Sequence, residues 1–110
     1  MDNALLIMFL ALVWAHTLLD YALQGDFVSK AKNFVSPISG VPPRLILFQH
    51  AFLQAGAVVY ITGSLLLGIV ELIAHYIIDS LKITNKISFY IDQFLHVLCK
   101  VIYILIIAKI

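Results

Sequence analysis

The sequence predicts an all-α fold, an integral membrane four-helix bundle that forms a single transmembrane helical domain over residues 1–110. Hydrophobic residues make up 63% of the chain and charged residues only 12%, which is unlike the composition of a soluble globular domain. The mean hydropathy of +1.04 agrees with this. The apolar residues also fall into four segments whose lengths suit membrane-spanning helices. The predicted helices cover residues about 4–24, 44–61, 64–82 and 88–108.

The first and last apolar segments are long enough to cross the hydrocarbon core of a bilayer at ~1.5 Å per residue. The two middle segments are shorter and are joined by Thr62-Gly63-Ser64. A glycine between small polar residues favours a hairpin break. The sequence alone leaves open whether residues 44–82 form two helices or one long helix.

The connection between the first two predicted helices is the only long one. Its first half places apolar residues on one helical stripe, which predicts a short interfacial helix at 27–35 on the membrane surface. An ordinary loop is the alternative. Five of the seven Lys and Arg residues lie in this connection or between the last two helices. The positive-inside rule therefore places both loops in the cytoplasm and both chain ends outside.

Histidines and acidic residues are paired at helical spacing. Three of the four histidines have an acidic residue four positions away, and residues four apart share one face of a helix. The pairs are His16–Asp20, Glu71–His75, His75–Asp79 and Asp92–His96. His50 has only Gln54 at this spacing. Because ionisable groups are costly inside a membrane, the repeated spacing indicates a site.

The predicted topology brings these residues to one layer. Counted from the helix ends at the two cytoplasmic loops, all four histidines lie at a depth of roughly 9 to 12 Å. Lipid offers no hydrogen bonds, so the narrow polar stripes must face the interior of the bundle. Glu71 lies one turn deeper than this layer, where it could orient a ligand or relay a proton.

Imidazole and carboxylate groups on one helix face can supply two ligands to an ion, or one ligand and the group that orients it. Facing helices can then complete the coordination. A mixed set of this kind favours a divalent transition metal, Zn, Mn or Fe, and there are enough candidates for one or two ions. The predicted metal ligands are His16, Asp20, His50, His75, Asp79 and His96. A helix–helix hydrogen bond is the alternative for His50, and Asp20 and Asp92 could be interfacial groups.

Several polar residues form a motif that spans most of the chain. It reads His16-x3-Asp20-Tyr21-x2-Gln24, then Lys30, His50, His75-x3-Asp79-x2-Lys82 and Asp92-Gln93-x2-His96. This motif resembles domain of unknown function 3307, a family of small polytopic membrane proteins from bacteria and their phages. The resemblance implies a multi-pass protein of the bacterial inner (plasma) membrane and supplies no activity. A looser likeness is to membrane-bound metal-dependent hydrolases, and Glu71 has no counterpart in the family pattern.

The resulting functional hypothesis is a membrane-embedded metal-dependent hydrolase acting on a phosphate-bearing or lipid-like substrate at the cytoplasmic face. Asp92 or Glu71 would serve as general base. The predicted substrate-binding residues are Gln24, Lys30, Lys82 and Gln93. The alternative is a non-enzymatic membrane protein, either one that handles metal ions or protons or a phage regulator, with a structural His/Asp network.

The expected partners are the lipid bilayer and further copies of the chain. Ala51-x3-Ala55 offers small residues for close packing in a homo-oligomer. No run of Lys or Arg residues suggests nucleic-acid binding.

Overall fold

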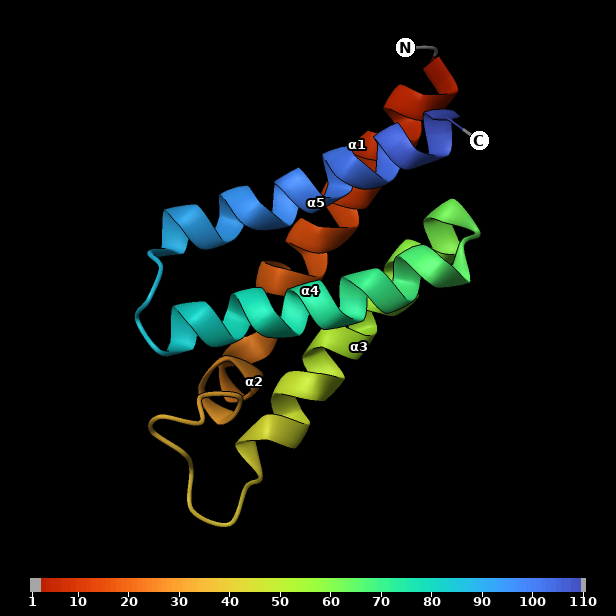
Figure 1. The fold of residues 1–110 in the computed structure, drawn as a ribbon. Helices are drawn as coiled ribbons and strands as arrows, with labels where there is room; N and C mark the ends of the chain where they lie inside the picture. The colour runs from red at the N-terminus through yellow and green to blue at the C-terminus, as the bar shows by residue number, and fades with distance from the viewer. Residues whose placement is uncertain (1–2, 110) are drawn as a thin grey trace.

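The computed structural model describes residues 3–109, and within them the protein is all-α without strands. The long helices are α1 (Asn3–Thr17), α3 (Pro43–Thr62), α4 (Leu65–Ile83) and α5 (Phe89–Lys109). Two shorter elements, the π-helical turn η1 (Leu18–Ala22) and the helix α2 (Gly25–Ala31), follow α1 (Figure 1). The all-α class predicted from the sequence is confirmed. The predicted domain also includes residues 1, 2 and 110, which lie outside the described part.

Residues 44–82 form two helices, which settles the question that the sequence left open. Gly63 adopts the left-handed conformation at φ 71° and donates its backbone N–H to Val59 O at 2.8 Å. The next residue, Ser64, begins α4, because its hydroxyl accepts the Leu67 N–H at 3.1 Å. A left-handed glycine that ends one helix and a serine that caps the next produce the tight reversal.

The short helix α2 ends earlier than the predicted range of 27–35. It stops at Ala31, and the side-chain Oδ1 of Asn33 accepts the backbone N–H groups of Val35 and Ser36 at 3.0 and 3.1 Å. This local turn satisfies backbone donors that a continued helix would use. Residues 32–35 therefore belong to the connection to α3.

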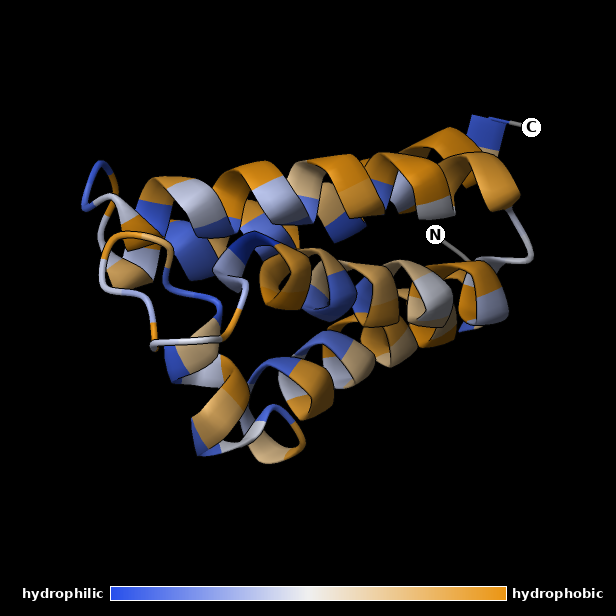
Figure 2. Cartoon of the chain, turned by 90° about the horizontal axis from the view of Figure 1, so that it is seen from below, coloured by the Kyte–Doolittle hydropathy of each residue, from blue (hydrophilic) through white to orange (hydrophobic). Residues whose placement is uncertain are grey.

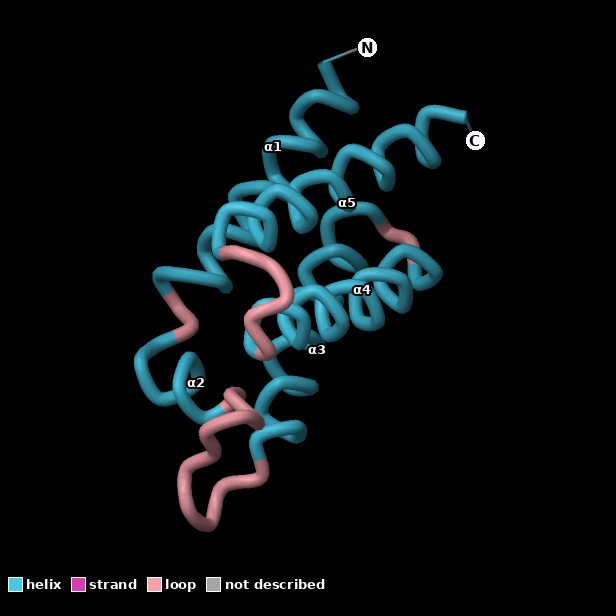
Figure 3. The backbone as a smooth tube through the Cα atoms, turned by 60° about the vertical axis from the view of Figure 1, so that its left-hand side comes forward, coloured by secondary structure: helices cyan, strands magenta, loops and turns pink. Residues whose placement is uncertain are grey.

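The four long helices surround a common interior. α1 packs against α3 and α5, α4 packs against the same two helices, and α2 packs against α3. Figures 1 and 3 show that the α3–α4 turn lies toward the C-terminal end of α5, whereas α2 and the two longer loops lie at the opposite end of the molecule. This end is called the loop end below.

Within residues 3–109, three segments are long and apolar enough to cross a membrane: Asn3–Ala22, Pro43–Thr62 and Phe89–Lys109. Large apolar side chains cover the outside, whereas His75, Asp79 and Asp92 are fully buried. This distribution is the reverse of that in a soluble protein. In Figure 2 most of the blue, hydrophilic segments gather in the half of the molecule at the loop end.

The other half of the interior is apolar. Its core is formed by Leu12, Val58, Leu67, Tyr103 and Ile104. Helices α3 and α4 approach closely there. The absence of a side chain at Gly68 permits this approach, since a Cβ at that position would overlap Val59 Cγ2.

The prediction for the Ala51-x3-Ala55 surface is wrong. Ala51 is 0% and Ala55 is 7% exposed, so these small residues pack inside the chain and present no outer surface. Small residues on α3 serve the close approach of α4 rather than a contact between copies. The homo-oligomer itself stays a prediction.

Candidate metal centre

Every long helix contributes buried polar side chains to one region of the interior near the loop end. These side chains are at most 5% exposed. They are His16 and Asp20 from α1 and η1, His50 from α3, Glu71, His75 and Asp79 from α4, and Asp92 and His96 from α5. We call these eight residues the polar cluster. It contains all six predicted metal ligands and both predicted general bases.

The π-helical turn η1 positions Asp20. Leu23 donates its backbone N–H to Leu18 O at 2.8 Å, which is the i to i+5 bond of a π-helix. Such turns are rare and occur frequently at functional sites. The turn places the Asp20 carboxylate among the histidines, with Oδ1 at 3.0 Å from His50 Nε2. No pattern in the sequence indicates this irregularity.

The first group in the cluster consists of Asp20, His50, His75 and Asp79, whose ligand atoms all lie within 4.8 Å of one another. The Nε2 of His50 lies 3.0 Å from Asp20 Oδ1 and 3.5 Å from Asp79 Oδ2. The Nε2 of His75 lies 3.8 and 3.4 Å from the same two oxygens. Ligand atoms of a tetrahedral zinc ion are about 3.3–3.6 Å apart, and these four distances of 3.0–3.8 Å are close to that spacing.

One atom of this group has no hydrogen-bond partner among the described residues. His75 is completely buried and its Nδ1 lies 3.0 Å from Glu71 Oε2, whereas its Nε2 is the unpartnered atom within residues 3–109. Since a carboxylate can only accept, Nδ1 carries a proton, and Nε2 faces the carboxylate oxygens of Asp20 and Asp79. An unpaired buried polar atom costs about 1–3 kcal/mol, and a bound cation would remove this cost.

A second group lies beside the first. Asp20, Asp92 and His96 also place ligand atoms within 4.8 Å of one another. The Nε2 of His96 lies 3.4 Å from Asp92 Oδ1 and 3.2 Å from Asp79 Oδ1. Asp92 Oδ1 is buried and has no hydrogen-bond partner in the part of the chain that the structure describes. The Nε2 of His16 lies 3.6 Å from Asp20 Oδ2.

Both carboxylate oxygens of Glu71 accept hydrogen bonds from neighbouring side chains. Its Oε2 accepts from His75, and its Oε1 accepts from Lys100 Nζ and Tyr103 Oη, each at 2.8 Å. This arrangement suits a residue that orients His75, and it occupies both oxygens that a general base would need. A signal for Lys100 was present in the sequence, because a lone cation in an apolar helix requires a buried partner.

Lys32, one of the cations in the connection between the first two predicted helices, belongs to the site. It is 3% exposed, and its Nζ donates to Asp79 Oδ2 at 3.1 Å. It comes from the connection after α2, whose position depends on tertiary packing. No periodic pattern in the sequence could have revealed this contact.

The four predicted substrate-binding residues lie at different distances from the polar cluster, and Gln93 makes hydrogen bonds within it. The Nε2 of Gln93 donates to Asp20 Oδ2 at 3.0 Å and Asp92 Oδ2 at 2.9 Å, and its Oε1 lies 3.1 Å from His16 Nε2. Gln93 is therefore part of the hydrogen-bond network of the cluster.

Two of the other three lie near the cluster and one does not. Gln24 donates to the backbone oxygen of Asp20 at 2.8 Å, and Lys82 Nζ lies 3.8 Å from Asp92 Oδ2. The side chain of Lys30 is 70% exposed and pairs with Asp26. The structure does not bring Lys30 to the site, because it lies on the outer face of α2.

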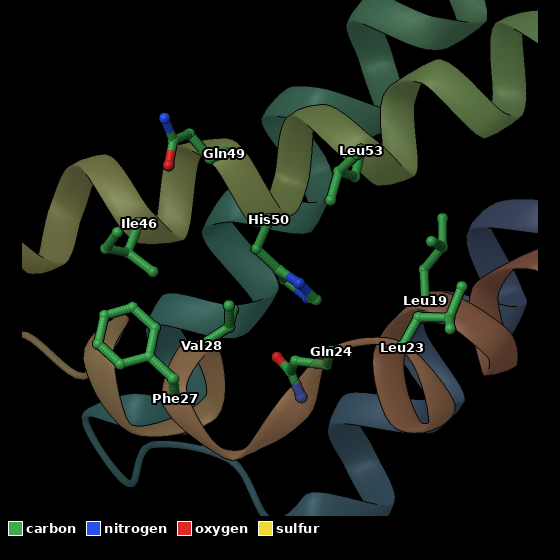
Figure 4. A pocket seen from close by; sticks show the side chains of 9 residues that line it. All are labelled: Leu19, Leu23, Gln24, Phe27, Val28, Ile46, Gln49, His50 and Leu53. Atoms are coloured by element: carbon green, nitrogen blue, oxygen red, sulfur yellow. The ribbon is translucent and has the colours of Figure 1, made fainter.

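An apolar pocket of about 440 Å³ adjoins the cluster. It lies between α3 on one side and η1 and α2 on the other (Figure 4). Its lining consists of Leu19, Leu23, Gln24, Phe27, Val28, Ile46, Gln49, His50 and Leu53. Leu23, Phe27 and Leu53 are 65%, 59% and 60% exposed, so the pocket opens on the apolar outer surface. His50 connects it to Asp20 and the cluster.

A family model described as "Protein of unknown function (DUF3307)" matches residues 7–110. The chain belongs to this family. The match includes every residue of the polar cluster, and it confirms the resemblance found from the spacing of the polar residues. No curated protein and no solved structure matches the chain. The likeness to membrane-bound hydrolases stays a prediction.

Proposed function

We propose that this member of the DUF3307 family is a membrane-embedded metal-dependent hydrolase. It acts on a phosphate-bearing, lipid-like substrate at the cytoplasmic face of a bacterial inner membrane. The observation that carries the proposal is the group of Asp20, His50, His75 and Asp79, into which His75 directs an Nε2 that no described residue binds. The mixture of imidazole and carboxylate ligands favours Zn, Mn or Fe.

In this proposal α1, α3, α4 and α5 together form a four-helix membrane bundle. Among the described residues, α1 together with η1, α3 and α5 each have the length and hydropathy of a span. The fourth, α4, buries its polar stripe and turns apolar residues outward, because Ile69, Ile73 and Ile77 are 48%, 56% and 53% exposed. Such a helix suits lipid on one side and a polar interior on the other.

The reaction is hydrolysis of a phosphoester. Asp20, His50, His75 and Asp79 would hold the metal ion, whose positive charge would lower the pKa of a water molecule and stabilise charge on the phosphoryl oxygens. The water oxygen bonds to phosphorus, the bond to the ester oxygen breaks, and the leaving alcohol takes up a proton. Asp92 retains an oxygen, unpartnered among the described residues, that can bind an ion or accept the proton of water, whereas both oxygens of Glu71 are occupied.

The pocket supports a substrate with a hydrocarbon chain. A volume of about 440 Å³ lies in the range of ordinary ligand sites. Six of its nine lining residues are apolar, and His50 points toward Gln24 in the middle of the lining (Figure 4). A chain that enters from the bilayer would place its phosphate near His50. Lys82, whose side chain is 28% exposed, lies near Asp92 and can neutralise an anion there.

A carrier of protons or metal ions is the second candidate, and one observation favours it. Lys100 and Tyr103 extend the buried polar groups beyond Glu71. Tyr103, however, is itself part of the apolar core with Leu12 and Val58. The polar groups therefore end against apolar side chains, as suits a site open at one side of the membrane.

Metal analysis followed by an activity assay tests the proposal. Full-length protein purified in detergent without chelators should contain a transition metal, and a His75→Ala, Asp79→Ala double variant should lose it. The wild-type protein should release phosphate or a phosphorylated headgroup from a panel of phospholipids and should be less active on nucleotides. Asp26→Asn, at an exposed carboxylate on α2, is the control.

Metal content near zero in the wild-type protein would overturn the metal site. Stoichiometric metal with no turnover of lipid or nucleotide substrates, together with metal-dependent uptake into proteoliposomes, would identify the carrier instead.

A further inference from the structure

We infer that the polar cluster binds two metal ions and that the carboxylates of Asp20 and Asp79 bridge them. The inference rests on the metal site proposed above and adds a second ion with its own ligands.

The two oxygens of Asp20 face different histidines. Oδ1 lies 3.0 Å from His50 Nε2 and 3.8 Å from His75 Nε2. Oδ2 lies 3.6 Å from His16 Nε2 and accepts from Gln93 Nε2 at 3.0 Å. Asp20 is also a member of both groups, because its ligand atoms lie within 4.8 Å of those of His50, His75 and Asp79 in one and of Asp92 and His96 in the other.

Asp79 divides its oxygens in the same way. Oδ2 lies 3.4 Å from His75 Nε2 and 3.5 Å from His50 Nε2. Oδ1 lies 3.2 Å from His96 Nε2. Asp20 and Asp79 come from different elements, η1 and α4, and each lies near candidate ligands of both ions. Two carboxylates arranged in this manner are suited to bridge a pair of ions.

Each of the two groups of candidate ligands also contains an atom without a hydrogen-bond partner among residues 3–109. This atom is His75 Nε2 in the first group and Asp92 Oδ1 in the second. One ion can satisfy only the side on which it lies. The first ion would use His50 and His75, the second would use His96 and Asp92, and both would share the two bridging carboxylates. His16 would lie beside the second ion, and its Nε2 is 3.1 Å from Gln93 Oε1.

The separation of the histidines fits a pair of ions. The rings of His75 and His96, one from each side, are stacked with centroids 4.2 Å apart and planes inclined by 28°. Two-metal hydrolytic centres place their ions about 3.5–4 Å apart. Neighbouring imidazoles at this separation can each bind one of two adjacent ions, and the ligand atoms of His75 and His96 lie within 4.8 Å of each other.

The charges favour an anionic substrate at such a centre. Asp20, Asp79 and Asp92 are buried together, and Lys32 is a buried cation that contacts Asp79. Two divalent ions and Lys32 would exceed the three carboxylates by two positive charges. A hydroxide and a phosphodiester group would balance them. Glu71 and Lys100 neutralise each other and do not change this account.

Manganese is a suitable probe because it binds to mixed histidine and carboxylate sites and is visible by electron paramagnetic resonance. Detergent-purified full-length protein is stripped with a chelator and titrated with Mn²⁺, and the bound metal is counted by equilibrium dialysis. We expect two ions per chain and a spin-coupled signal. Asp92→Asn keeps the side-chain volume and should reduce the count to one ion with an uncoupled signal. Asp26→Asn should behave as the wild-type protein does.

The outcomes separate this inference from the proposed function. One ion per wild-type chain, or two ions without spin coupling, would overturn the bridged pair and leave the metal site intact. No bound ion would overturn both. The wild-type count requires no substitution, so misfolding of a variant cannot decide the result.

Discussion

The environment of Glu71 leads to a sharp prediction about how His75 is prepared for metal binding. In the wild-type protein the Glu71 carboxylate accepts from His75 Nδ1 at 3.0 Å, which fixes the proton there and leaves Nε2 free to bind a metal ion. Glu71→Gln changes almost no volume but replaces one oxygen by an NH2 group. If the new NH2 group faces His75, it donates to Nδ1, and the proton moves to Nε2, the atom that should ligate. If the amide is rotated, its NH2 group meets Lys100 and Tyr103, which are themselves donors.

Both orientations weaken the site, so Glu71→Gln should lower metal affinity. Loss of a residue that orients a metal-bound histidine typically reduces affinity about 10- to 100-fold, which corresponds to about 1.4–2.7 kcal/mol. The assay is competition between the purified protein and a chelator of known affinity. Asp26→Asn makes the same chemical change at an exposed carboxylate and should leave the affinity unchanged.

Stability must be separated from this effect. Breaking a buried ion pair costs about 3–5 kcal/mol, and Glu71→Gln leaves the Lys100 ammonium without its carboxylate. A double variant, Glu71→Gln with Lys100→Met, removes both charges and should recover most of the thermal stability of the metal-free protein. It should still bind metal weakly, because a neutral amide accepts from His75 Nδ1 less strongly than a carboxylate and raises the basicity of Nε2 less. An affinity within about twofold of the wild-type value in both variants would refute the role assigned to Glu71.

The packing and the charges lead to three more predictions. Lys32→Met should raise metal affinity about tenfold or more in the same competition assay, because a charge-assisted hydrogen bond of about 1.5–3 kcal/mol no longer competes for Asp79; unchanged affinity would contradict this. Gly68→Ala should lower stability by about 1–3 kcal/mol in thermal unfolding, since its Cβ would overlap Val59 Cγ2. Gly56→Ala, whose Cβ would meet no described atom within 4 Å, should be neutral or stabilising. Chelator treatment of the wild-type protein should lower its Tm, and excess Mn²⁺ should restore it, as about 2.7 kcal/mol is expected at a metal concentration about 100 times the Kd; a Tm insensitive to metal would argue against ligation in the folded state.

Local sequence patterns were sufficient for most of the helices. Gly63 and Ser64 divided α3 from α4 where the sequence favoured a break, because a left-handed glycine and an N-cap act over only a few residues. The predicted range of 27–35 continues beyond the end of α2 at Ala31. Its end depends on the turn that the Asn33 side chain stabilises, which the apolar stripe of this segment does not reveal.

The spacing of histidines and acids also predicted which side chains meet. Residues four apart share a helix face wherever that face points, and lipid excludes polar stripes from the outside. The contact of Lys32 with Asp79 and the exposure of Lys30 show the limit of this reasoning. The two lysines are two positions apart in one short segment, and only the docking of α2 against α3 separates a buried cation from an exposed one.

By itself the sequence determined the all-α class, the apolar helices and the set of residues that form the polar cluster. These properties follow from hydropathy and helical periodicity, which are local. The tertiary structure alone decided how the oxygens of Asp20 and Asp79 divide between two groups of histidines, that Glu71 is bound by Lys100 and Tyr103, and that a pocket reaches His50. Each of these depends on the relative rotation and depth of different helices and on the π-helical turn at Asp20, and no repeat within a single helix encodes them.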